Sequence, residues 1–209
     1  MLTRRIQQAA LMILVAASAA SCGGSRPIKY YVLDAGPAPA VSAAPQIPVT
    51  LLVSRVTAAH LYRDDRLVYG ANDVQLGTYE YQRWAEPPAG MMEDLVIKTL
   101  RASGSYRSVS RIASNVHGDY IVRGQLFSLD EVQSPGLSAR FSFEMELYDP
   151  KTSATVWSGS YTHDEPVNGK SVSDVVEALD RNVKAGLTQL IGELGQYLAS
   201  HPPQSASGQ

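Results

Sequence analysis

The chain has 209 residues, of which 44% are hydrophobic and 18% charged, and its formal net charge is −2. This composition supports a buried core and excludes a disordered polyelectrolyte, and without a basic excess or a basic run nucleic acid is not an expected partner. The single cysteine cannot form an intramolecular disulfide, and a cysteine zinc site needs several, so packing has to hold the fold together.

Residues 1–21 have the three-part layout of a secretory signal peptide. Arg4 and Arg5 give a basic start, a short apolar stretch follows, and small residues occupy positions 16–21. The apolar stretch is too short to span a bilayer comfortably, and the lack of any charge from residue 9 to residue 21 argues against an ordinary amphipathic helix. We therefore predict that residues 1–21 direct export and are removed.

Cys22 follows this segment directly, after 19-AAS-21. The arrangement resembles the lipobox of bacterial lipoproteins, although Ala19 stands where leucine is more usual. The resemblance implies that Cys22 is acylated, carrying fatty acids such as palmitate, and becomes the mature N-terminus of a lipidated tether, residues 22–27. Gly23 stands where an inner-membrane retention signal would have aspartate, which implies sorting to the outer membrane. A free reactive thiol or a core cysteine is the alternative.

The first predicted strand covers residues 28–34, IKYYVLD. Residues 35–48 then hold four prolines among fourteen positions, a composition that predicts an extended connection. Because the strand is too apolar for a linker, we expect it to join the sheet from a distance.

Three further strands are predicted by β-rich runs between polar or glycine-containing turns, at residues 49–56, 66–71 and 74–84. The period changes in residues 87–104, where a proline pair precedes and Gly104 ends a helical pattern. Its apolar face repeats at spacings of three and four and contains Met92, Leu95, Val96, Thr99 and Leu100.

Strands return at residues 106–112, 119–132 and 140–149. The last of these alternates most regularly, which predicts one buried and one wet face, as in antiparallel sheets. Its buried face would contain Phe141, Phe143, Met145 and Leu147. A turn at residues 149–152 makes residues 155–163 the expected hairpin partner.

The last predicted element is a long helix. Ser171 with Asp174 is a start signal, and prolines after His201 end the helix. Three glycines, Gly186, Gly192 and Gly195, weaken it by about 1 kcal/mol each, which suggests close packing against a neighbour. The apolar stripe is Val172, Val176, Leu179, Val183, Leu187, Leu190, Leu194 and Tyr197.

The order of strands, helix, strands and helix predicts one α+β domain over residues 28–200. We expect an antiparallel or mixed β-sheet with two main helices packed on one face. Residues 201–209 are predicted to be a disordered tail.

Candidate chemistry is sparse. The four histidines are scattered, and His163, the only one beside carboxylates, is expected in a solvated loop. The acidic pairs 64–65 and 93–94 are adjacent in sequence and are expected to face solvent, with a calcium role left open. No nucleophile elbow or phosphate-binding loop occurs, and 168-NGKS-171 is expected to be a turn. We therefore predict a protein that is not an enzyme and has no metal or cofactor beyond the lipid on Cys22.

Residues 79–95, YEYQRWAEPPAGMMEDL, allow two interpretations. In the first, an aromatic strand turns through a proline pair into a helix, with Trp84 packed under the turn. In the second, aromatic and arginine side chains form a surface for a partner protein or a lipid headgroup.

Taken together, several of these stretches resemble the ABC-type transport auxiliary lipoprotein family, which includes the PqiC-type intermembrane transport lipoproteins. They are the lipobox cysteine, YYVLD at residues 30–34, RWAEPP at 83–88, the MMEDLV helix and SG-x-Y-x-x-V. Arg83, Trp84, Pro87 and Pro88 match the family pattern as a partner-binding or structural motif, and the family supplies no catalytic residues.

The resemblance implies a lipoprotein facing the periplasm whose partner is an MCE-domain protein of an ABC transport system moving phospholipids or other hydrophobic compounds. ATP hydrolysis would belong to another subunit. Two functions stay open at this point. The chain docks the MCE assembly at the outer membrane, or it carries acyl chains in a groove between helix and sheet. A homo-oligomer is compatible with either.

Overall fold

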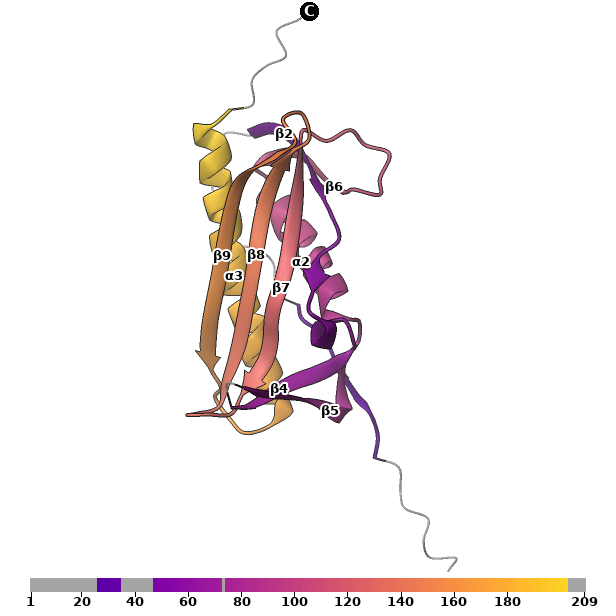
Figure 1. The fold of residues 1–209 in the computed structure, drawn as a ribbon, viewed down its shortest axis with the longest axis vertical. Coiled ribbons are helices and arrows are strands. Elements are labelled where there is room, and N and C mark those ends of the chain that lie inside the picture. Colours follow the sequence, from indigo (N-terminus) through magenta and orange to yellow (C-terminus); the bar gives the residue numbers. More distant parts are fainter. Residues whose placement is uncertain (1–25, 35–46, 73, 203–209) are drawn as a thin grey trace, which may run out of the picture.

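The computed structural model describes residues 26–34, 47–72 and 74–202. In these ranges a nine-stranded sheet carries two long helices on one face (Figure 1). The strands are β1 (Lys29–Tyr31), β2 (Ile47–Val53), β3 (Thr57–Ala58), β4 (Arg66–Asn72), β5 (Gln75–Trp84), β6 (Tyr106–Arg111), β7 (Tyr120–Val132), β8 (Ser138–Asp149) and β9 (Ala154–Pro166). The helices are the short 3-10 helix η1 (His60–Tyr62), α2 (Pro88–Ala102) and α3 (Val172–Ser200).

Strand β7 organises the sheet. One of its edges pairs along its length with β8 in the antiparallel sense, and β8 pairs in turn with β9. Its other edge pairs successively with β2, β3 and β4, all parallel to it. Beyond them, β6 adds to β2, while β5 adds to β4 and β1 to β5. The sheet is therefore mixed, and β1 does join it from beyond the connection, as predicted.

The alternation of β8 produces the two-sided sheet expected from the sequence. Phe141, Phe143, Met145 and Leu147 are fully buried, whereas the residues between them are only half-buried. Helix α3 lies against β8 and β9, and α2 packs on β6 with further contacts to β2 and β7. Both helices lie behind the sheet in Figure 1, which confirms the predicted α+β class and the single covered face.

The predicted start of the last helix is confirmed by its hydrogen bonds. Ser171 caps α3: its Oγ accepts a bond from the Asp174 backbone N–H at 3.2 Å, and its own N–H donates to Asp174 Oδ2 at 2.8 Å. This reciprocal pair is a capping box. At α2, Pro87 occupies the N-cap and Pro88 the first turn, where a missing N–H costs nothing. Gly104, just past the helix, has φ of +63°.

One glycine of α3 permits a close approach to the β8–β9 hairpin. A Cβ at Gly186 would lie 2.6 Å from the Tyr161 ring and 2.9 Å from Phe141, so only hydrogen fits there. Gly192 has open space around it, and the nearest atom to a Cβ at Gly195 is 3.7 Å away. Close packing, predicted for all three, therefore applies to Gly186 alone.

Asn182 joins α3 to the same hairpin from within the core, where it is 1% exposed. Its Nδ2 donates to the carbonyls of Ala139 at 2.9 Å and His163 at 2.8 Å, and its Oδ1 accepts from the Tyr161 hydroxyl at 3.0 Å. The side chain thus ties the helix to both strands of the hairpin.

Replacing Asn182 by alanine should lower the free energy of unfolding by about 1–3 kcal/mol for each buried group left unpaired. Gln196→Ala, at an exposed position of the same helix, should change it by less than about 0.5 kcal/mol. Urea denaturation followed by circular dichroism measures both variants, and equal losses would contradict the anchoring role of Asn182.

The structure differs from the sequence-based boundaries in four places. Strand β1 ends at Tyr31, and residues 32–34 leave the sheet. The predicted connection ends earlier, because Ile47 and Pro48 already belong to β2, with a register irregularity just after them. His163 lies in β9 rather than in a loop, although its side chain is exposed. The two-residue β3 and the three-residue η1 were not predicted, since elements this short carry no periodicity.

In the described ranges, no helix combines the length and the apolar character needed to cross a bilayer.

Candidate functional site: the N-terminal strap and the helix-free face

Two of the stretches that resemble the family pattern, at residues 30–34 and 83–88, lie side by side. Strand β1 runs parallel to the end of β5, so that Tyr30 is opposite Arg83 and Tyr31 opposite Trp84. The Tyr31 carbonyl accepts a hydrogen bond from the Ala85 N–H at 2.7 Å, and the Tyr31 hydroxyl donates to Gln82 at 2.8 Å. Segments about fifty residues apart in sequence therefore form one structural unit.

We call residues 28–34 the N-terminal strap, because after β1 they cross from the sheet to both helices. Leu33 is buried and shares the wall of a cavity of about 190 Å³ with Met91 and Leu95 of α2. The Asp34 N–H donates to Asp180 Oδ1 of α3 at 2.8 Å, and Lys98 of α2 donates to Asp34 Oδ1 at 2.5 Å. One residue at the end of the strap thus contacts both helices.

The charges at this junction follow from its geometry. The hydrogen bond and the positive charge of Lys98 lower the pKa of the Asp34 carboxyl below its ordinary value. Burial raises the pKa of Asp180, while the hydrogen bond from the Asp34 backbone opposes that rise. The contacts that Asp34 makes with Lys98 and Asp180 are therefore ordinary polar contacts at the protein surface.

Arg83 and Trp84 occupy the other side of the unit. The Arg83 guanidinium donates to Asp65 Oδ1 at 2.9 Å, which holds the end of β5 against the turn before β4. Trp84 is 1% exposed, and its backbone N–H donates to the Asp65 carbonyl at 2.6 Å. The indole of Trp84 is therefore packed inside the domain and does not lie on an open surface.

Pro87 and Pro88 carry the chain from β5 into α2. The Pro87 carbonyl accepts hydrogen bonds from the N–H groups of Gly90 and Met91, and Pro88 is buried. Together with Arg83 and Trp84, the prolines set the position of α2 against the β1–β5 edge. Cys22, the predicted lipidation site, lies outside the described residues.

The acidic pairs singled out in the sequence are paired with arginines. Asp64 lies 3.7 Å from Arg66, and Asp65 binds Arg83 as described above. Arg111 of β6 bridges Glu93 and Asp94 of α2. Within the described ranges, no group of three or more histidine, cysteine, aspartate or glutamate side chains is placed to hold a metal ion.

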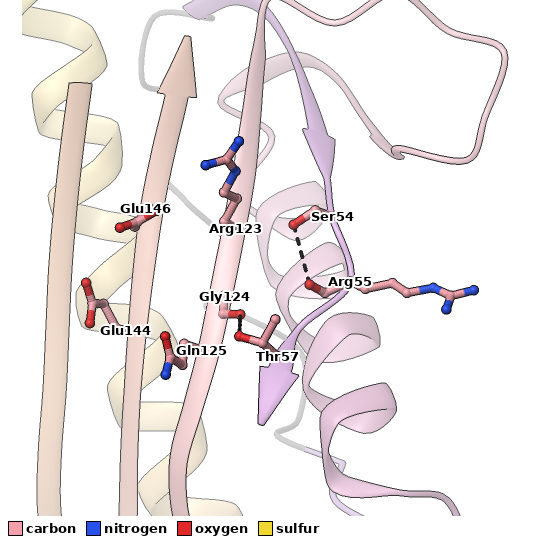
Figure 2. A pocket seen from close by; sticks show the side chains of 8 residues that line it. All are labelled: Ser54, Arg55, Thr57, Arg123, Gly124, Gln125, Glu144 and Glu146. Atoms are coloured by element: carbon pink, nitrogen blue, oxygen red, sulfur yellow. Dashed lines mark hydrogen bonds between the residues drawn. The ribbon is translucent and has the colours of Figure 1, made fainter. Parts of the chain in front are cut away.

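The face of the sheet away from the helices carries a shallow cavity of about 180 Å³ (Figure 2). It lies where β2 has ended and β3 has not yet begun, so the two strands leave part of the β7 edge uncovered. Thr57 Oγ1 donates to the Gly124 carbonyl there at 3.3 Å. The other lining residues are Ser54, Arg55, Arg123, Gln125, Glu144 and Glu146.

The side chains around this cavity diverge. The Arg55 guanidinium points away from it in Figure 2, and the Arg123 guanidinium lies over the Tyr148 ring, 3.8 Å from its centroid. Glu144 and Glu146 project from the neighbouring strand β8. Charged groups of both signs beside an aromatic ring suit noncovalent contact with a polar partner surface, and this arrangement supplies no nucleophile with an adjacent base.

Two buried acids on β7 were not singled out by the sequence. Asp130 is 3% exposed and accepts a hydrogen bond from the Tyr62 hydroxyl at 2.8 Å. Glu131 accepts from the Tyr79 hydroxyl and from Gln133 Nε2, both at 2.8 Å. The only sequence signal was that the acidic pair stands between Leu129 and Val132 near the end of the strand. Asp130 thus connects β7 to η1, and Glu131 connects β7 to β5.

Burial raises the pKa of Asp130, against the smaller effects of Tyr62 and Arg140. The unfolded chain loses this proton at the ordinary pKa, whereas the folded protein keeps it to higher pH. The contribution of Asp130 to stability is therefore fully present below the ordinary pKa and is lost as pH rises through the raised value. Asp130→Asn keeps an acceptor for Tyr62 but cannot ionise.

The Asn variant should accordingly gain stability relative to the wild type as pH rises from about 4 towards neutral. Paired urea titrations at a series of pH values measure this difference, and a difference that is constant with pH would contradict the assignment.

A family model described as ABC-type transport auxiliary lipoprotein component matches residues 31–191, more than half of the chain. No curated protein matches the sequence significantly.

Two solved structures show the same fold at low identity. Protein XCC0632 from Xanthomonas campestris has a TM-score of 0.72 and 22% identity, over 83% of this chain and 99% of that chain. The hypothetical protein CT253 from Chlamydia trachomatis has a TM-score of 0.52 and 7% identity, over 75% of this chain and 99% of that one. With the family match extending from β1 into α3, the chain belongs to the ABC-type transport auxiliary lipoprotein component family.

Proposed function

We propose that this protein is a noncatalytic lipoprotein, anchored in the outer membrane through acylated Cys22 and facing the periplasm. It docks an MCE-domain assembly of an ABC transport system that moves phospholipids or other hydrophobic compounds between membranes. The family match over residues 31–191 is the observation that carries this proposal, because it assigns the chain to an auxiliary lipoprotein component of ABC-type transport. The lipobox at Cys22 supports the anchor.

Docking is favoured over lipid carrying by the packing between helix and sheet. The layer that an acyl groove would occupy is filled by fully buried side chains of β8 and α3, including Phe141, Phe143, Leu179 and Leu187. The close contact of Gly186 with the hairpin narrows this layer further. An acyl chain could enter this layer only by displacing these buried side chains from the core.

The helix-free face is the surface that we assign to the partner. Helices cover the opposite face of β7, β8 and β9, whereas this one presents Arg123, Tyr148, Glu144 and Glu146 together with the half-exposed Phe127. Arginine and aromatic residues are enriched at the centres of protein interfaces.

A pull-down of the lipidated protein from detergent-solubilised membranes tests the proposal. The wild type and the control Glu177→Lys, an exposed substitution on α3, should recover an MCE-domain protein, and the double variant E144K/E146K should recover much less. Failure of the wild type to recover any MCE-domain protein would count against the transport role. Native mass spectrometry of the unacylated Cys22→Ala protein tests the carrier alternative, which a stoichiometric bound phospholipid would establish.

A further inference from the structure

The N-terminal strap exposes three apolar side chains at and beside β1. Tyr30 lies in the strand, Ile28 precedes it and Val32 follows it, and the three are 62%, 44% and 64% exposed. The alternation places them on one side, while Tyr31 and Leu33 point to the other side and pack against the core. In the described part of the sheet β1 pairs only with β5, so Tyr30 lies on an edge strand, whereas Val32 lies beyond the end of that strand near α2 and α3.

An open edge strand with an exposed apolar row promotes unwanted association unless something covers it. The exposed side chains of Ile28, Tyr30 and Val32 lie where the domain meets its tether. We therefore expect another surface to cover them. The candidates are a lipid surface, a second copy of this chain and a partner protein.

The distance to the predicted anchor selects the lipid surface. Ile28 comes six residues after Cys22, and six residues span at most about 20 Å when fully extended. With Cys22 acylated and its chains in the bilayer, β1 cannot leave the immediate vicinity of the lipid headgroups. A protein partner would have to fit into this narrow space, whereas the bilayer is already there.

The chemistry of the row fits the same occupant. Tyr30 combines an apolar ring with a hydroxyl group, the type of side chain enriched at membrane interfaces. Arg26 and Lys29 flank the row and are exposed, so they add positive charge for anionic phospholipids. Asp34 is bound to Lys98, and the carboxylates of Glu86, Glu177 and Asp180 lie around Val32, so the positive charge is confined to the Ile28–Tyr30 end of the strap.

We propose that Ile28, Tyr30 and Val32 form a second membrane contact, with β1 lying on the surface of the bilayer that holds the lipid anchor. This contact rests on the proposed acylation of Cys22. It fixes the orientation of the domain relative to the bilayer, which attachment at the single residue Cys22 does not define. The helix-free face would then keep a constant direction relative to the membrane.

Fluorescence quenching by lipid tests this contact on the full-length lipidated protein. Acylation consumes the Cys22 thiol, so a single introduced cysteine can carry an environment-sensitive dye. Tyr30→Cys and Val32→Cys are compared with Ser160→Cys, an exposed position of β9, in vesicles of phosphatidylethanolamine and phosphatidylglycerol that contain brominated lipid. Quenching at positions 30 and 32 should be at least about threefold stronger than at 160, because collisional quenching requires contact with the bilayer.

The outcomes separate this contact from the anchor beneath it. Protein that floats with the vesicles and carries acyl chains by mass spectrometry, yet shows equal quenching at positions 30 and 160, would overturn the contact and leave the anchor intact. Disulfide cross-linking between copies through Tyr30→Cys without lipid quenching would overturn it in favour of a second copy. Protein that is not acylated at all would overturn both proposals together.

Discussion

Replacement of Cys22 by alanine should move the protein from the membrane fraction to the soluble periplasmic fraction without lowering its thermal stability. Cys22 comes seven residues before Lys29, the first residue of the first strand of the described domain, so we expect the fold not to depend on its side chain. The variant has no thiol to acylate, and one weak contact at β1 cannot replace several acyl chains. Membrane flotation followed by immunoblotting measures the effect, and circular dichroism checks the fold.

Ser25→Ala, in the same tether, is the matched control and should remain in the outer-membrane fraction. An alanine variant at position 22 that floats with the outer membrane as fully as the wild type would show that the anchor lies elsewhere.

Replacement of Trp84 by alanine should lower the free energy of unfolding by about 3–5 kcal/mol, the usual cost of removing a large aromatic side chain from a core. Trp84 is 1% exposed and stands opposite Tyr31 at the point where β1, β5 and the start of α2 meet. The cavity would therefore loosen the strap as well as the helix. Urea denaturation followed by far-ultraviolet circular dichroism avoids dependence on the fluorescence of the lost tryptophan.

Two variants calibrate this result. Tyr81→Ala, on the same strand but half-exposed, should cost far less than Trp84→Ala. Trp84→Phe should fall between them, since Trp84 Nε1 has no hydrogen-bond partner in the described structure and a phenyl ring fills much of the volume. If Trp84→Ala kept full stability but abolished recovery of the partner, the surface interpretation of this residue would be right and the core interpretation wrong.

Local patterns in the sequence were sufficient to predict most individual elements. Strand β8 follows from strict alternation, and α3 follows from a capping pair and an apolar stripe over many turns. The same stripe did not indicate Asn182, because a polar residue at the edge of an apolar face is indistinguishable from a solvated one until its partners are known. Those partners, the carbonyls of Ala139 and His163, lie on other elements.

The topology could not be predicted because it depends on pairings between distant segments. Nothing in residues 119–132 indicates that one edge of β7 would pair with three parallel strands in turn. The family stretches at 30–34 and 83–88 can be recognised in the sequence as motifs. Their structural role, however, follows from the pairing of β1 with β5, which the sequence does not indicate. Arg83, Trp84, Pro87 and Pro88 then became parts of one junction. Cys22 remains a prediction from the lipobox.

The attachment of the strap has a mechanical consequence. Force between the anchored end and a bound partner reaches β1 and the Asp34 contacts before any other part of the sheet, and β1 has only three residues in register with β5. We expect it to detach first. Residues 28–34 would then leave the fold, adding a contour length of roughly 24 Å at about 3.3–3.6 Å per residue. Single-molecule pulling on the unacylated protein, with one handle on the Cys22 thiol, should record an early extension of this length at low force. The domain could then remain bound to a partner while its distance from the membrane changes.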